Sequence, residues 1–204
     1  MSTPEAMVAR NNRTKLILIV ALFMLPPIAA WVAWKVMGDA GAGATTNAGT
    51  LIAPARPVHL VGVVDADGRP ATDAELRGRW TYVVFGAAGC DQRCERQLYL
   101  TRQIRLAMNK DIARVQRLLV LDRAPAQDLA QRLAAEHEDL RWVVRDSTAE
   151  PFLQRFRGDG FDAGGSHYFL VDPLGNLMMS YDLEVPAKGM MRDLQKLLKI
   201  SQIG

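Results

Sequence analysis

The sequence predicts an α/β domain, with a central sheet flanked by helices, preceded by one N-terminal transmembrane helix. Two observations carry this prediction. Residues 16–34 contain no charged side chain, which is typical of a helix that crosses a bilayer. From residue 58 onward, short runs of β-forming residues alternate with helical patterns, as they do in α/β proteins. The length of 204 residues suits one domain of ordinary size plus an anchor.

The N-terminal apolar stretch is long enough to cross a hydrocarbon core of about 30 Å as a helix. The flank beyond it is poor in positive charge, whereas three cations precede it: Arg10, Arg13 and Lys15. The positive-inside rule therefore places the N-terminus in the cytoplasm. We expect a cytoplasmic segment over residues 1–15, a single-pass anchor in a bacterial inner membrane over residues 16–37, and a C-terminal domain in the periplasm. The alternative is a cleaved signal peptide, whose apolar region usually runs only about 7–15 residues.

The segment after the anchor, residues 38–57, is expected to be a flexible linker because Gly, Ala and Thr dominate it. The folded domain is expected over residues 58–204. Its first strand is predicted at residues 58–64, before a turn rich in Asp and Gly. A short helical turn then leads to residues 80–85, whose run of β-forming residues suits a central strand.

The rest of the domain continues this alternation. A helix is predicted from Asp91 to about Lys110, because apolar residues recur there among many charges. The turn Asp172–Asn176 predicts a hairpin. The remaining predicted elements are strands at 115–121, 142–144, 168–171 and 177–181, and helices at 126–137, 150–156 and 188–198. This order is that of a thioredoxin-like core, with helices on both faces of the sheet.

Charge and cysteine content narrow the function. The formal net charge is +3, and the Lys and Arg residues are scattered among acidic ones, so we expect no nucleic acid among the partners. Two cysteines are too few for a scaffold held together by disulfides. They lie close together, however, which is typical of a functional pair.

The cysteine pair, Cys90 and Cys94, lies where the predicted strand 80–85 ends and the long helix begins. Sites in open α/β sheets gather at the carboxyl ends of strands, and a helix N-terminus stabilises a thiolate. The pair can chelate a metal as thiolates, or oxidise if its Cα atoms lie within about 6.8 Å. A purely structural disulfide across so short a loop contributes only about 2 kcal/mol, which favours a functional dithiol.

His167 is the histidine best placed to join the cysteines, because the loop before strand 168–171 faces the cysteine turn in a thioredoxin-like core. Two thiolates and an imidazole suit copper(I), with zinc as an alternative. The competing interpretation is a loop histidine that only forms hydrogen bonds. We expect His59 and His137 to be structural, His137 as a cation at the end of a helix.

Several motifs resemble the Sco/SenC family. They are the stretches 67–70 and 76–80, the pair Phe85-Gly86 followed by Cys90 and Cys94, and the late strand and turn over 168–175. The resemblance runs from about residue 58 to the C-terminus. Members of this family are membrane-anchored, thioredoxin-like copper-binding proteins that assist cytochrome c oxidase assembly. The resemblance implies copper held by Cys90, Cys94 and His167, with an oxidase subunit or another assembly factor as partner.

The chain also departs from the family pattern. Asp91 and Glu95 follow the two cysteines, where the family usually has proline. Gly164 stands where the family's ligand histidine normally lies, and His167 is three residues away. Three hypotheses follow: a copper metallochaperone, a thiol–disulfide oxidoreductase without metal, and a non-catalytic assembly scaffold. Whether the protein is an enzyme depends on which of them holds.

Overall fold

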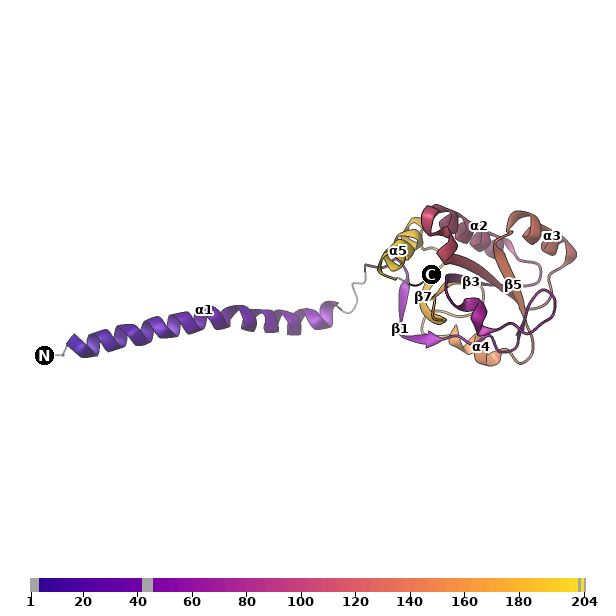
Figure 1. Cartoon of the computed structure of the whole chain (residues 1–204). Coiled ribbons are helices and arrows are strands. Elements are labelled where there is room, and N and C mark those ends of the chain that lie inside the picture. The colour runs from indigo at the N-terminus through magenta and orange to yellow at the C-terminus, as the bar shows by residue number, and fades with distance from the viewer. Residues whose placement is uncertain (1–3, 42–45, 202, 204) are drawn as a thin grey trace. The chain divides into compact units, whose positions relative to one another are not determined.

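The computed structural model describes residues 4–41, 46–201 and 203. It divides into two compact units, which separate between Thr46 and Asn47. The first unit is helical, and the second combines strands with helices (Figure 1).

The first unit is a single helix, α1 (Pro4–Gly41). Within it, Arg13–Ala33 is long and apolar enough to cross a membrane, and no other helix among the described residues is. Its described side chains are exposed over this stretch. The structure therefore confirms the predicted N-terminal apolar helix.

The second unit is built on a seven-stranded sheet with the order β1-β7-β6-β3-β4-β5-β2. β3 is central, parallel to β4 and antiparallel to β6. β3 and β4 are buried along almost their whole length, which explains their continuous apolar runs. The strands are β1 (Thr50–Pro57), β2 (Val63–Val64), β3 (Trp80–Gly86), β4 (Val115–Leu121), β5 (Leu140–Arg145), β6 (His167–Val171) and β7 (Asn176–Asp182).

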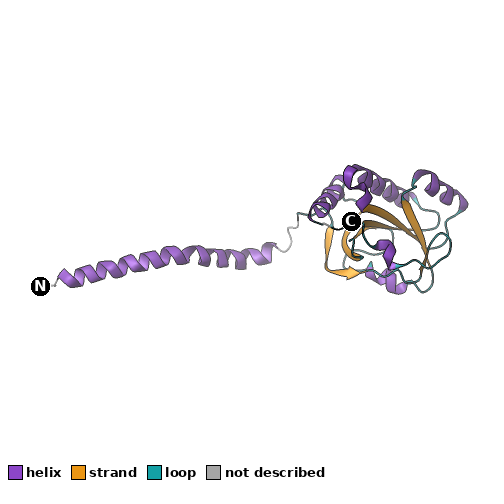
Figure 2. Ribbon diagram, viewed as in Figure 1, coloured by secondary structure: helices purple, strands orange, loops and turns teal. Residues whose placement is uncertain are grey.

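Helices cover both faces of this sheet, as the sequence predicts (Figure 2). On one face, Leu98, Leu133 and Leu194 bring α2, α3 and α5 into a single hydrophobic cluster. On the other face, Phe152 packs α4 into a second cluster, which also contains Phe156 directly after the helix. The helices are α2 (Gln92–Ala107), α3 (Gln127–Glu136), α4 (Glu150–Arg155) and α5 (Ala187–Ile200), with 3-10 helices η1 (Asp73–Leu76) and η2 (Asn109–Arg114).

The second unit holds a complete core of its own. All members of both clusters lie between Ile52 and Leu198, so no buried apolar residue of the core is supplied by the first unit. The arrangement is the predicted thioredoxin-like α/β fold.

The expected linker differs from the observed structure. Residues 38–41 continue α1, and residues 42–45 lie outside the described residues. Residues 50–57 are not linker but strand β1, which pairs antiparallel with β7. β1 is an edge strand, and an edge strand tolerates prolines such as Pro54 and Pro57. The strand expected at 58–64 is correspondingly reduced to the two residues of β2.

Candidate functional site

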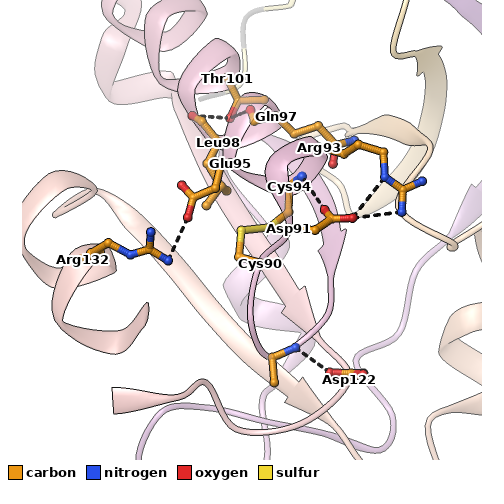
Figure 3. The surroundings of a disulfide bond; sticks show 11 residues. Cys90, Asp91, Arg93, Cys94, Glu95, Gln97, Leu98, Thr101, Asp122 and Arg132 are labelled. Carbon is orange, nitrogen blue, oxygen red and sulfur yellow. Dashed lines mark hydrogen bonds and ion pairs between the residues drawn. A yellow bond between two sulfur atoms is a disulfide. The ribbon is translucent and has the colours of Figure 1, made fainter. Parts of the chain in front are cut away.

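Cys90 and Cys94 form a disulfide at the end of β3 and the start of α2 (Figure 3). Their Cα atoms are 5.1 Å apart, within the range that a disulfide bridges. Both residues are buried, at 4% and 2% exposed. The pair thus lies at the carboxyl end of a central strand, where the sequence predicted it.

The two cysteines have different backbone environments. α2 begins at Gln92, so Cys94 belongs to its first turn, whereas Cys90 lies in the turn before the helix. The φ of Cys90 is +44°, in the left-handed region that non-glycine residues rarely adopt. Its amide donates a hydrogen bond to the carbonyl oxygen of Ala87, 2.9 Å away. Cys90 is therefore held in a tight turn that presents it just outside the helix.

Asp91, between the cysteines, caps α2. Its carboxylate accepts a hydrogen bond of 3.0 Å from the amide of Cys94 and two from the guanidinium of Arg93. The hydrogen bond from the amide of Cys94 lowers the pKa of Asp91 below its ordinary value, and the interaction with Arg93 lowers it further. Desolvation opposes this shift. The residue that replaces the family's proline is thus an N-cap, and its negative charge is paired.

Glu95, after the second cysteine, also has a cationic partner. Its carboxylate pairs with Arg132 of α3 at 3.1 Å. Both carboxylates beside the disulfide are therefore matched by arginines (Figure 3). This pairing reduces their repulsion of a thiolate at the helix N-terminus.

Gly86 lets the sulfur of Cys94 pack against β3. A Cβ atom at this position would lie 2.9 Å from the Sγ atom of Cys94. The carbonyl oxygen of Gly86 accepts a hydrogen bond from the amide of Asp122, and the carboxylate of Asp122 accepts one of 2.8 Å from the amide of Ala88. These contacts fix the turn that precedes Cys90.

A pocket of about 190 Å³ opens beside this turn. Its lining combines backbone of the turn with charged side chains and the loop before β6. The lining includes Gly86, Ala87, Asp91, Arg93, Asp122, Arg145, Gly164 and Gly165. A partner group that approaches the disulfide from this side meets both signs of charge.

His167 is the first residue of β6 and does not lie in the preceding loop. Its carbonyl oxygen accepts a 3.0 Å hydrogen bond from Nε2 of the buried Gln97. Its ring lies 6.1 Å from that of Phe169, two residues on, and alternate residues of a strand share a face. Phe169 belongs to the cluster on the α4 side, whereas the cysteines belong to the cluster on the α2 side.

The structure therefore brings Cys90 and Cys94 together, but does not place His167 with them. Among the described residues, no group of three His, Cys, Asp or Glu side chains could hold a metal ion. The two sulfurs are bonded to each other, and His167 shares the opposite face of the sheet with Phe169. The donor set of this oxidised form does not fit a three-ligand copper site.

Sequence reasoning found the cysteines but not their surroundings. Asp122 follows β4 directly, so the rule that sites gather at strand ends could have identified it. Arg132 carries no such pattern, because its pairing with Glu95 depends on packing between α2 and α3. The Phe85-Gly86 motif marks Gly86 in the sequence, but not its close approach to the sulfur of Cys94. Gly164 stands out in the sequence only as the position where the family's ligand histidine normally lies.

Comparison with known proteins supports the fold. The family model described as "Transmembrane-like, thioredoxin-like, C-terminal domain" matches residues 80–201. None of the curated proteins compared with the chain matches it significantly.

Solved structures with the same fold include Sco proteins and a thiol–disulfide protein. Copper-bound yeast Sco1 is 16% identical, with a TM-score of 0.58 over 72% of this chain and 93% of that one. Apo Sco1 from Thermus thermophilus is 20% identical, with a TM-score of 0.58 over 76% and 99%. A thiol:disulfide interchange protein from Bacteroides sp. is 16% identical, with a TM-score of 0.54 over 74% and 93%. The Sco/SenC resemblance is confirmed at the level of the fold.

Proposed function

Since the chain belongs to the family of transmembrane-like, thioredoxin-like C-terminal domains, we propose that it is a membrane-anchored thiol–disulfide exchange protein whose reactive group is the Cys90–Cys94 pair. The observation that carries this proposal is the disulfide at the junction of β3 and α2. The pair closes so short a loop that it adds little stability. A thioredoxin-like fold and a helix N-terminus favour a role in redox chemistry.

The proposed reaction transfers two electrons from a partner dithiol to the disulfide. A partner thiolate attacks one sulfur, which forms a mixed disulfide and releases the other cysteine as a thiolate. A second partner thiol then displaces the first cysteine. Cys90 and Cys94 end as thiols and the partner as a disulfide, and the reverse sequence reduces an oxidised partner.

We assign the mixed disulfide to Cys90. This residue lies outside the helix, between exposed neighbours Gly89 and Asp91, whereas the sulfur of Cys94 packs against Gly86. Attack on Cys90 releases Cys94 as the thiolate. Cys94 lies in the first turn of α2, where the partial positive charge of the helix stabilises an anion.

A trapping experiment tests this assignment. In a Cys94→Ser variant, Cys90 should form a stable mixed disulfide with glutathione when glutathione disulfide is added. A Cys90→Ser variant should react at least about tenfold more slowly, because its remaining thiol is packed against β3. The proposal fails if neither variant forms the adduct while its fold is intact by circular dichroism.

Copper(I) binding by the reduced pair is the second candidate. Three of the solved structures with this fold hold copper, and two cysteines whose Cα atoms are 5.1 Å apart can offer two soft thiolates once reduced. His167 could join them only if the start of β6 rearranged. Anaerobic copper(I) titration of the reduced protein should give near-stoichiometric binding that Cys90→Ser abolishes. A His167→Ala variant that binds equally well would leave the two thiolates as the only ligands from this set.

The location and client are also part of the proposal. We place α1 across a bacterial inner membrane and the second unit in the periplasm, because the flanking charges follow the positive-inside rule. The proposed client is a cytochrome c oxidase subunit or another assembly factor, on the strength of the Sco/SenC resemblance. Resistance of the full chain to carbonate extraction tests the anchor. Oxidase assembly in cells that carry the double serine variant tests the client.

A further inference from the structure

Positive charge is concentrated on two neighbouring helices of the second unit. α2 and α5 together contain eight Lys or Arg residues and two Asp or Glu residues, whereas the whole chain has a formal net charge of only +3. The rest of the chain is therefore net negative. α2 and α5 lie side by side on the same face of the sheet (Figure 1), so the exposed cations of the two helices lie on neighbouring elements.

Four cations of these two helices are available to a partner. Arg96, Lys188, Arg192 and Lys199 are exposed, and none of the four forms an ion pair with another described residue. We call these four residues the basic face. The only acid of α5, Asp193, is 2% exposed and faces inward. The other acid of these helices, Glu95, is paired with Arg132.

Acidic residues do lie next to the basic face, in the loop before α5. Asp182 and Glu184 are exposed there. One carboxylate oxygen of Asp182 accepts hydrogen bonds from the amides of Glu184 and Val185, which ties it to its own turn. The four cations of the basic face remain uncompensated.

Exposed apolar side chains accompany these cations. Ile200, the last residue of α5, is 80% exposed, and Ile203 is 48% exposed. Tyr99, one turn after Arg96 on α2, is 58% exposed. Cations combined with exposed aliphatic and aromatic side chains are typical of surfaces that rest on a bilayer interface.

The chain that comes from α1 joins the second unit at α5. One carboxylate oxygen of Asp193 accepts hydrogen bonds of 2.8 and 3.1 Å from the amides of Ala48 and Gly49. A Cβ atom at Gly189 would lie 2.6 Å from the Cβ of Ala48. The last residue of α1 is Gly41, and the seven peptide units from there to Ala48 reach at most about 25 Å.

We propose that the basic face binds the anionic surface of a phospholipid bilayer. The inference rests on the proposed anchor, because a short connection to a membrane helix keeps α5 near lipid headgroups. Each Lys or Arg near an anionic bilayer strengthens its binding. Four cations and the exposed isoleucines can therefore hold the domain on lipid once the anchor has raised the local lipid concentration. The surface would fix which side of the domain faces the membrane and therefore where the disulfide is presented.

Vesicle sedimentation of residues 47–204, which contain the complete core, tests the proposal without the anchor. The unit should bind vesicles of phosphatidylglycerol and phosphatidylcholine but not of phosphatidylcholine alone, and salt should weaken the binding. The triple variant Lys188→Gln, Arg192→Gln, Lys199→Gln should bind at least about tenfold more weakly. A matched control, Arg77→Gln, Arg79→Gln, Arg155→Gln, removes the same charge from exposed positions outside α2 and α5 and should bind like the unaltered unit.

If the two triple variants lose the same affinity for anionic vesicles, only net charge matters, and the proposal is overturned. Release of the unit by polyglutamate at concentrations that match the anionic lipid would assign an acidic protein instead, which also overturns it. Thiol exchange with dithiothreitol should be unchanged in both triple variants. This measurement separates a failure of the proposed thiol–disulfide exchange from a failure of lipid binding. If the full chain resists carbonate extraction but the unit does not bind anionic vesicles, the anchor is supported and the proposal for the basic face is wrong. If the unit binds anionic vesicles but carbonate extracts the full chain from the membrane, the basic face is supported and the proposed anchor is contradicted.

Discussion

A methyl group at Gly86 would meet the sulfur of Cys94, because a Cβ atom there lies 2.9 Å from Sγ. Gly86→Ala should therefore lower the free energy of unfolding of the oxidised protein by about 1–3 kcal/mol, as overpacking does. Gly89→Ala is the matched control, since a Cβ atom at Gly89 meets nothing within 4 Å. Urea denaturation of both variants measures the difference. Equal losses would show that the close approach at Gly86 is not what makes glycine necessary.

His137 ends α3, but its surroundings disfavour the cation expected there from the sequence. It is 7% exposed, and burial, followed by the charges of Arg117 and Arg102, lowers its pKa below the ordinary value. The unfolded chain therefore takes up a proton more readily than the folded protein, so stability should fall as pH drops through about 6.5 and below. His137→Gln should remove that part of the pH dependence. Urea denaturation at pH 7.5 and 5.5 measures the free energy of unfolding of both proteins. If the variant loses as much stability between these two pH values as the unaltered protein does, the prediction is contradicted.

At the scale of an element, the start of α2 depends on its cap. Asp91→Ala removes the acceptor for the amide of Cys94 and should cost about 1 kcal/mol. Asp91→Asn keeps a capping oxygen and should retain most of that stability at neutral pH. Because the pKa of Asp91 is lowered in the folded state, its ionic contribution is present above the ordinary pKa and is lost as pH falls through the folded value. Denaturation at pH 7 and pH 3 separates the two effects, and equal losses in both variants at pH 7 would exclude capping.

Most elements of the second unit could be predicted because their patterns are local. β3 and β4 are continuous apolar runs, and the hairpin of β6 and β7 surrounds a turn marked by Asp, Pro and Gly. β1 could not be recognised, because its prolines and alanines form a strand only through pairing with β7. The same distinction holds at the site. The cysteine spacing is visible in the chain, whereas the face on which His167 lies depends on its register in β6.

At the scale of the whole molecule, the boundary of the domain lies at about residue 47, before β1. Ile52 of β1 is 6% exposed and belongs to the cluster on the α4 side. Strand β1 also covers the edge of β7, and an uncovered edge strand promotes association between chains. The first residues of the unit are held to α5 by Asp193. Segment 48–57 therefore closes the fold, and does not merely connect it to α1.

A chain of residues 58–204 should accordingly be less stable than one of residues 47–204. It loses the ladder between β1 and β7, the burial of Ile52 and both hydrogen bonds to Asp193. We expect a lower midpoint of thermal unfolding, by at least about 5 °C, and association in size-exclusion chromatography through the uncovered edge of β7. Asp193→Ala in the longer chain should reproduce part of this effect, because two amides lose their acceptor, and should lower the free energy of unfolding by about 1–3 kcal/mol. Asp193→Asn keeps an acceptor oxygen and should lower it less. If the shorter chain unfolds at the same temperature and stays monomeric, β1 is dispensable and the domain begins where the sequence alone placed it.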